Sequence, residues 1–224
     1  SYVRDVVARD VAERLGREDI RIANQFALYG LRNTACEFSV NQLVESFKEL
    51  GFKIYWEKAD RIMDLLRQAF LLMKVEEHAF ALKPQTTATP KVYGIDPGIV
   101  YAVSRANQQD VGKRFETAVY LELRRRMAGK RTESITSYTA PGPRGQKVDF
   151  LLGDALAAEP YALIQVTASM ASPRTREREV DSLVAAMEAT GIKEGTIVTL
   201  REEERIETEA GPIEVVPACK WFLR

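Results

Sequence analysis

The chain has few of the residues that build metal and redox centres. Its 224 residues include one histidine, His78, and two widely separated cysteines, Cys36 and Cys219. A single imidazole excludes a histidine-rich metal site, and the cysteines match no zinc or disulfide spacing. We therefore expect reduced thiols in a cytoplasmic protein.

The chain also lacks net charge, long apolar runs and a nucleotide-binding loop. Lys plus Arg and Asp plus Glu both number 32, so only a local patch could attract a nucleic acid. No apolar run reaches the ~20 residues that cross a bilayer, so we expect no membrane partner. Neither Gly112-Lys113 nor Gly129-Lys130 has a glycine five residues before its Gly, which excludes a Walker A loop here.

The first part has a helical pattern followed by short strands. Apolar spacing predicts helices over residues 3–15, 19–31, 40–50 and 56–70. Ser39 and Gln42 have the spacing of a capping box, and Asp96-Pro97 is typical of a helix start. Strands are expected at residues 71–75, 79–82 and 91–95, around the loop Lys83–Pro90. Helices followed by a hairpin with a long tip predict a winged-helix-like domain over residues 1–108.

The second part, residues 109–224, alternates between helix and strand patterns. A helix of about 18 residues is expected from Val111 to Gly129, and another over Pro173–Thr190. Strands are expected at residues 134–139, 147–152, 161–167, 196–200, 205–208, 213–216 and 219–222. This order predicts an α/β (α+β) domain with a central mixed sheet.

Three elements of the second part carry oxygen-bearing side chains. Glu116 lies in its first helix, Asp149 inside an apolar strand, and Gln165 with Thr167 on one face of another strand. Burying a carboxylate inside an apolar strand costs free energy unless a hydrogen-bonding or charged partner lies beside it. Converging carboxylate and amide oxygens hold Mg²⁺, which activates water at a phosphodiester. Asp149 and Gln165 are therefore candidate metal ligands.

These segments resemble a known nuclease superfamily. Gly112–Glu116, Val148-Asp149-Phe150 and Gln165-Val166-Thr167 are similar to the three motifs of the PD-(D/E)xK nucleases. With the preceding winged helix, the layout resembles the C-terminal half of a family of prokaryotic AAA-type ATPases, and Tyr2–Val11 looks like the junction after the ATPase domain. The resemblance implies a restriction-endonuclease-like fold, a longer polypeptide, and ATP bound only by an N-terminal domain outside this chain.

The third motif departs from the family pattern. Gln165-Val166-Thr167 stands where Glu-x-Lys is expected, so the lysine that positions the attacking water is missing. Lys147, two residues before Asp149, is a candidate replacement, although a lysine beside an aspartate is more often a surface pair. Glu116 can equally be a salt-bridged helix residue, and Asp149 a hydrogen-bonded strand carboxylate. We therefore expect a degenerate nuclease-like site.

Basic residues gather around the helix that begins at Val111. The candidates for nucleic-acid contact are Lys113, Arg114, Arg124, Arg125, Lys130, Arg131 and Arg144. Such a cluster can hold phosphates, or it can be an ordinary solvated helix face. Three functions remain open: a non-catalytic module that binds DNA or a partner, a protein-docking or oligomerisation arm, and a metal-dependent DNA endonuclease.

Overall fold

A computed structural model describes residues 2–16, 19–78, 89–104, 111–142, 145–157 and 159–224. The described parts of Ser1–Val75 and Thr89–Thr117 form one compact unit, and those of Glu76–Ala88 and Ala118–Arg224 form a second. The division falls inside a helix, between Thr117 and Ala118. These units reflect packing, and the domain boundary between residues 108 and 109 stays a prediction.

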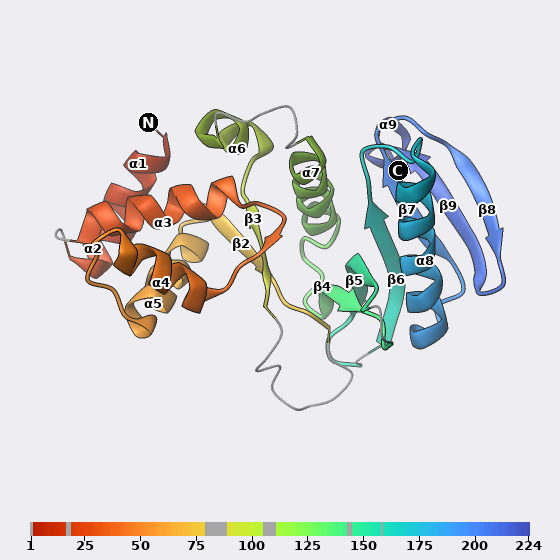
Figure 1. The fold of residues 1–224 in the computed structure, drawn as a ribbon, viewed down its shortest axis with the longest axis horizontal. Coiled ribbons are helices and arrows are strands. Elements are labelled where there is room, and N and C mark those ends of the chain that lie inside the picture. Colours follow the sequence, from red (N-terminus) through yellow and green to blue (C-terminus); the bar gives the residue numbers. More distant parts are fainter. Residues whose placement is uncertain (1, 17–18, 79–88, 105–110, 143–144, 158) are drawn as a thin grey trace. The chain divides into compact units, whose positions relative to one another are not determined.

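The first unit consists of helices and a small antiparallel sheet (Figure 1). Its elements are α1 (Tyr2–Val6), the π-helix η1 (Val7–Val11), α2 (Ala12–Leu15), α3 (Ile20–Arg32), β1 (Cys36–Glu37), α4 (Val40–Glu49), α5 (Trp56–Gln68), β2 (Leu72–Val75), β3 (Lys91–Gly94) and α6 (Pro97–Ser104). The strands pair in the order β1-β3-β2. Helices followed by a hairpin give the winged-helix-like order that the sequence predicts.

Apolar spacing and helix caps explain the first unit. Phe26, Leu43 and Ile62 are fully buried in one core, which also includes valines of η1. Ser39 Oγ accepts a hydrogen bond from the Gln42 N–H at 3.4 Å, as expected of an N-cap. Each helix therefore buries the apolar face that its spacing predicts.

The second unit contains a six-stranded mixed sheet. The helix α7 (Val111–Arg126) enters it at Ala118, and the other elements are β4 (Glu133–Thr139), β5 (Lys147–Asp154), β6 (Glu159–Val166), α8 (Pro173–Thr190), β7 (Gly195–Thr199), β8 (Glu204–Thr208), β9 (Gly211–Pro217) and α9 (Ala218–Trp221). The strand order is β4-β5-β6-β7-β9-β8, with β6–β7 and β7–β9 parallel and the other pairs antiparallel. The α/β (α+β) class with a mixed sheet is confirmed.

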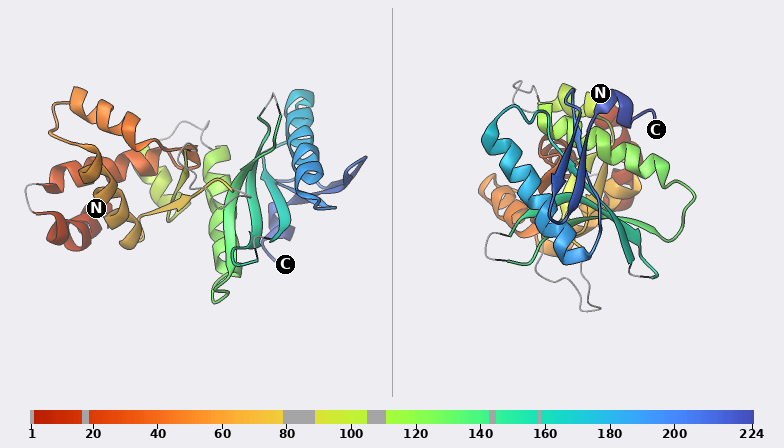
Figure 2. Two further views of the ribbon diagram at one scale, coloured as in Figure 1. Left: turned by 90° about the horizontal axis from the view of Figure 1, so that it is seen from below. Right: turned by 90° about the vertical axis from the view of Figure 1, so that its right-hand side faces the viewer.

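Helices cover both faces of this sheet. The helix α8 packs on β5, β6, β7 and β9, and the part of α7 from Ala118 lies against the opposite face (Figure 2). On that face the Tyr120 ring stacks on Phe150, with 6.0 Å between centroids. Leu183 and Met187 of α8 are buried on the other face. The sheet is therefore the middle layer of three.

Two predictions about elements need correction or fall outside the structure. The strand expected at Cys219–Phe222 is wrong, because Ala218–Trp221 is the helix α9, which buries the Trp221 ring. A run of four residues is too short for periodicity to separate strand from helix. The strand expected at Ala79–Leu82 lies outside the described residues.

In the parts of the chain that the structure describes, no helix combines the length and the apolar character needed to cross a membrane.

Candidate functional site

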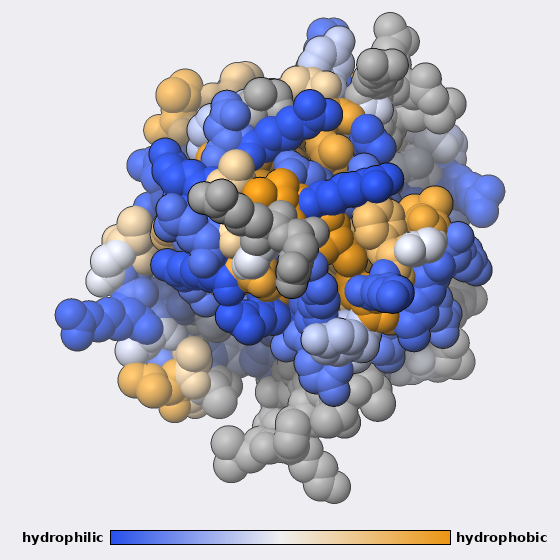
Figure 3. Space-filling model, turned by 90° about the vertical axis from the view of Figure 1, so that its left-hand side faces the viewer, coloured by the Kyte–Doolittle hydropathy of each residue, from blue (hydrophilic) through white to orange (hydrophobic). Residues whose placement is uncertain are grey.

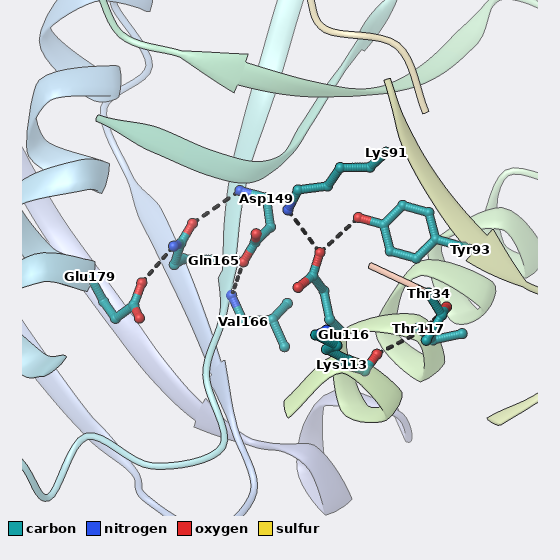
Figure 4. A network of polar contacts seen from close by, with 10 residues as sticks. All are labelled: Thr34, Lys91, Tyr93, Lys113, Glu116, Thr117, Asp149, Gln165, Val166 and Glu179. Atoms are coloured by element: carbon teal, nitrogen blue, oxygen red, sulfur yellow. Dashed lines mark hydrogen bonds and ion pairs between the residues drawn. The ribbon is translucent and has the colours of Figure 1, made fainter. Parts of the chain in front are cut away.

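Strands β5 and β6 separate at Asp149 and Gln165. Their backbone pairing reaches Phe150 opposite Ile164 and is not continued to the next residue pair. There the Asp149 N–H donates to Gln165 Oε1, and the Val166 N–H donates to Asp149 Oδ2, each at 3.0 Å (Figure 4). The two side chains thus replace backbone ladder bonds and hold the separating strands together.

A buried carboxylate completes this arrangement. Gln165 Nε2 donates to Glu179 Oε2 at 2.5 Å, and Glu179 lies in α8 with 2% of its surface exposed. The Arg178 guanidinium bonds the other carboxylate oxygen. Both polar atoms of Gln165, which is 7% exposed, are therefore engaged inside the fold. We call Asp149, Gln165 and Glu179 the strand bridge.

The remaining residues of the nuclease-like pattern in the second unit have other positions. Lys147 is exposed at the start of β5, opposite Thr139 of β4. Thr167 stands where the motif lysine is expected, and its hydroxyl donates to the Ser169 carbonyl at 3.3 Å. Its short side chain supplies no ammonium group, so the chemistry of the missing lysine is not replaced at that position.

Glu116 belongs to the first unit, where β3 supplies its partners. Glu116 Oε1 accepts hydrogen bonds from Lys91 Nζ at 2.9 Å and from the Tyr93 hydroxyl at 2.7 Å (Figure 4). Beside it, the Thr117 and Thr34 hydroxyls are 2.7 Å apart. The ion pair that sequence reasoning kept as an alternative for Glu116 is therefore present.

The strand bridge is a poor magnesium site. Mg²⁺ requires near-octahedral oxygen ligands and is usually bound through carboxylates. Among the described residues, no group of three or more His, Cys, Asp or Glu side chains is placed to hold a metal ion. The amide oxygen of Gln165 already accepts the Asp149 N–H, and one Asp149 oxygen accepts the Val166 N–H. Mg²⁺ does not fit this donor set, and no reaction step is assigned to it.

The predicted phosphate-contact residues are divided between the two units. Lys113 and Arg114 lie in the first turn of α7 in the first unit, where the Arg114 guanidinium lies 5.2 Å from the centre of the Tyr101 ring. Arg124, Arg125, Lys130 and Arg131 are exposed in the second unit, around the C-terminal end of α7. Arg144 lies outside the described residues.

A buried glutamate neutralises part of this basic end. Arg125 makes two hydrogen bonds to Glu122, at 2.6 and 2.7 Å, and Arg126 makes a third at 2.7 Å. The hydrogen bond from Arg125 is the main reason why the pKa of Glu122 falls from 4.5 to about 2. Arg126 also lies 4.0 Å from the centre of the Trp221 ring and bonds the Trp221 carbonyl. Arg125 and Arg126 are therefore both bonded to Glu122, and the Arg125 side chain stays exposed.

A pocket of about 360 Å³ opens between the end of α7 and the start of β4. Tyr120, Met127 and Ile135 give it apolar walls, and Arg124 and Lys130 give it cationic groups. Its one carboxylate, Glu133, accepts a hydrogen bond from the Tyr161 hydroxyl and lies 3.9 Å from Lys130 Nζ. Burial and this bond to Glu133 raise the pKa of Tyr161 well above its ordinary value of 10. Tyr161 is thus a hydrogen-bond donor to Glu133. We call this feature the α7 pocket.

Charged side chains of α5 are bonded inside the first unit. This helix has the position of the DNA-recognition helix in the winged-helix plan. Lys58 pairs with Asp19 at 2.6 Å, and Arg61 donates to the Arg14 carbonyl at 2.8 Å. Arg14 in turn donates to Gln68 at 2.6 Å. Arg14 and Asp19 thus engage charged groups of α5 within the first unit.

Comparison with known proteins identifies one family over the first part of the chain. Residues 1–110 match the family model DUF8612, described as a domain of unknown function. The chain is therefore similar to this family across the whole winged-helix-like part. No curated protein and no solved structure matches the chain.

The sequence points to Asp149, Gln165 and Glu116 but not to their partners. Glu179 lies in a helix whose apolar spacing gives no sign of a buried carboxylate, and it bonds a residue 14 positions earlier. Lys91 and Tyr93 reach Glu116 from more than 20 positions away. A sequence offers no local signal for contacts of this kind.

Proposed function

We propose that this chain is a non-catalytic, nucleic-acid-binding region of an AAA-type ATPase, and that it binds phosphates through the end of α7. The observation that carries the proposal is the positive charge at the surface around the end of α7, where Arg124, Lys130 and Arg131 are exposed. The polar atoms of Gln165 in the strand bridge are engaged inside the fold. The association with an ATPase domain rests on the resemblance of the motifs alone.

Local charge supports phosphate binding even though the whole chain is neutral. Residues 122–133 contain five cationic side chains and two carboxylates. Glu122 is engaged by Arg125 and Arg126, and Glu133 lies 3.9 Å from Lys130 Nζ, so the cations outnumber the carboxylates at this end. Arg124, Lys130 and Arg131 are exposed there. A patch of this size gives weak, salt-sensitive binding that does not depend on sequence.

The test is a triple substitution of these three residues to glutamine. For each phosphate that is no longer neutralised, the slope of log affinity against log salt should fall by about 0.9 on duplex DNA and about 0.7 on a single strand. We therefore expect the triple variant to lose binding at low salt and to lower the duplex slope by about 2.7. Fluorescence anisotropy with labelled DNA in EDTA measures both quantities.

The matched control replaces three other exposed cations of the second unit by glutamine, namely Arg174, Lys193 and Arg201. It changes the net charge by the same amount but leaves the end of α7 intact. Equal loss of binding in both triple variants would mean that net charge alone matters. Unchanged binding in the α7 variant would contradict the proposed surface.

A second candidate function, a docking arm, is favoured by exposed apolar side chains in the first unit. Leu50, Tyr55 and Trp56 are 72%, 60% and 51% exposed around the turn between α4 and α5. On the face drawn in Figure 3, hydrophobic patches lie among hydrophilic side chains. Sedimentation velocity tests self-association through this turn. A Leu50→Ser/Trp56→Ser variant should be more monomeric than a Tyr2→Ser control, and equal behaviour would remove this candidate.

A further inference from the structure

The α7 pocket contains groups that are not needed for binding a phosphate backbone. Exposed cations are enough to hold a nucleic-acid backbone, but this pocket also has apolar walls and a carboxylate acceptor. Its volume of about 360 Å³ lies within the range of small-molecule sites. All of its lining residues belong to the second unit. Its shape and chemistry therefore belong to one compact body.

The groups of the pocket match the parts of a nucleotide. Met127 and Ile135 offer apolar surface to a planar base, and Arg124 and Lys130 offer positive charge to its phosphate. Glu133 can only accept hydrogen bonds, since the Tyr161 hydroxyl donates to it and Lys130 lies nearby. A carboxylate acceptor suits the exocyclic amine of cytosine, adenine or guanine, which thymine lacks.

From this arrangement we infer that the α7 pocket binds one unpaired nucleotide with an exocyclic amine, the amine on Glu133 and the phosphate beside Arg124 and Lys130. This inference rests on the proposed function and names its preferred ligand. A base inside a duplex has this amine engaged in pairing and its faces stacked, so the pocket selects single strands. The other contacts of the end of α7 remain indifferent to sequence.

The first experiment compares oligodeoxycytidine with oligodeoxythymidine of equal length on the whole chain. Both strands stack weakly and carry the same charge, but only cytidine offers an exocyclic amine. One hydrogen bond to a charged acceptor should make the cytidine strand bind about tenfold more tightly. A Glu133→Gln variant still accepts from Tyr161 but loses the charge, so it should bring the two affinities close together. Equal affinities in the unchanged protein would overturn the inference.

A second variant fills the pocket without removing its cations. Ala128 lines the pocket at an exposed position, so Ala128→Glu introduces a carboxylate there. We expect it to weaken single-strand binding about tenfold more than duplex binding. The control Ala189→Glu adds the same charge at an exposed position of α8 and should leave both unchanged. An unaltered single-strand affinity in Ala128→Glu would also overturn the inference.

These measurements distinguish a failure of the phosphate-binding surface from a failure of the nucleotide pocket. If all strands bind equally and the triple glutamine variant abolishes binding, the phosphate-binding surface stands and the nucleotide pocket falls. If no strand binds at low salt, both fall. Competition with cytidine monophosphate identifies the source of the nucleotide. Displacement by the free nucleotide at the affinity of the strand would assign the pocket to a mononucleotide, and weaker displacement would assign it to a strand.

Discussion

The strand bridge makes a quantitative prediction that a metal site does not make. Replacing Gln165 by leucine keeps the volume but removes the acceptor of the Asp149 N–H and the donor to Glu179. A buried N–H without a partner costs about 1–3 kcal/mol, and removing a hydrogen bond to a charged group costs a similar amount. Because Arg178 still pairs with Glu179, we expect a total near 3 kcal/mol.

The assay is thermal unfolding followed by circular dichroism. A loss of about 3 kcal/mol should lower the Tm by about 10 °C in a chain of this size. The same substitution at Gln25, an exposed residue of α3, should change the stability by less than about 0.5 kcal/mol. A Gln165→Leu variant as stable as the Gln25→Leu control would refute the bridge.

A Gln165→Glu variant gives the sharper comparison. The new carboxylate would face Glu179 across the 2.5 Å hydrogen bond, so the pair must share a proton or repel. A proton shared between the two carboxyl groups relieves this repulsion. Stability should therefore be lower than in the unchanged protein at neutral pH and should recover as the pH falls toward 5. An ancestral metal site predicts the opposite, namely a tighter Mn²⁺ complex with no loss of stability.

Three further predictions concern other parts of the chain. Burial lowers the pKa of His78 below its ordinary value of 6.5, so the stability of the fold should decrease as the pH drops below 6.5. An NMR titration that gives the single imidazole a pKa of 6.5 or higher would contradict this. The pKa of Glu122 is about 2, so the stabilisation by its carboxylate is present above pH 4.5 and lost as the pH falls through about 2. The Tm deficit of Glu122→Gln should shrink correspondingly, and a constant deficit would contradict it. Gly211→Ala would place a Cβ 2.1 Å from the Lys193 carbonyl oxygen at a φ of +132°, so we expect a loss of about 3 kcal/mol. Gly191→Ala, at φ +78° in open space, should cost only about 1 kcal/mol, and equal costs would show that the contact is irrelevant.

Local sequence signals were enough to predict most of the fold. The helix α8 has the predicted bounds, because Pro173 starts it and Gly191 ends it in a left-handed conformation. The predicted strands of the second unit up to β9 differ from the observed ones by at most two residues at either end, which is the usual uncertainty of strand ends. The two-residue strand β1 was not predicted, since it exists only as a partner of β3.

The candidate site was predictable only in part, because its meaning depends on distant partners. The order of Glu116, Asp149 and Gln165 along the chain is visible in the sequence. Whether those groups hold a metal or hold the fold together depends on Glu179 and on the place where β5 and β6 separate. The spacing of the motif shows neither the bond to Glu179 nor the place where the strands separate. The same motif is therefore compatible with a metal site and with a structural bridge.

Whether this chain binds DNA without cutting it can be decided by measuring DNA binding and cleavage by the whole chain, in EDTA and in Mn²⁺, beside an Asp149→Ala variant. With the cation competition for DNA matched in the EDTA solution, we expect similar affinity for labelled single-stranded DNA in both solutions, no cleavage product, and retained binding by the variant. Mn²⁺-dependent cleavage that disappears in Asp149→Ala would contradict this expectation and identify the strand bridge as a working nuclease site.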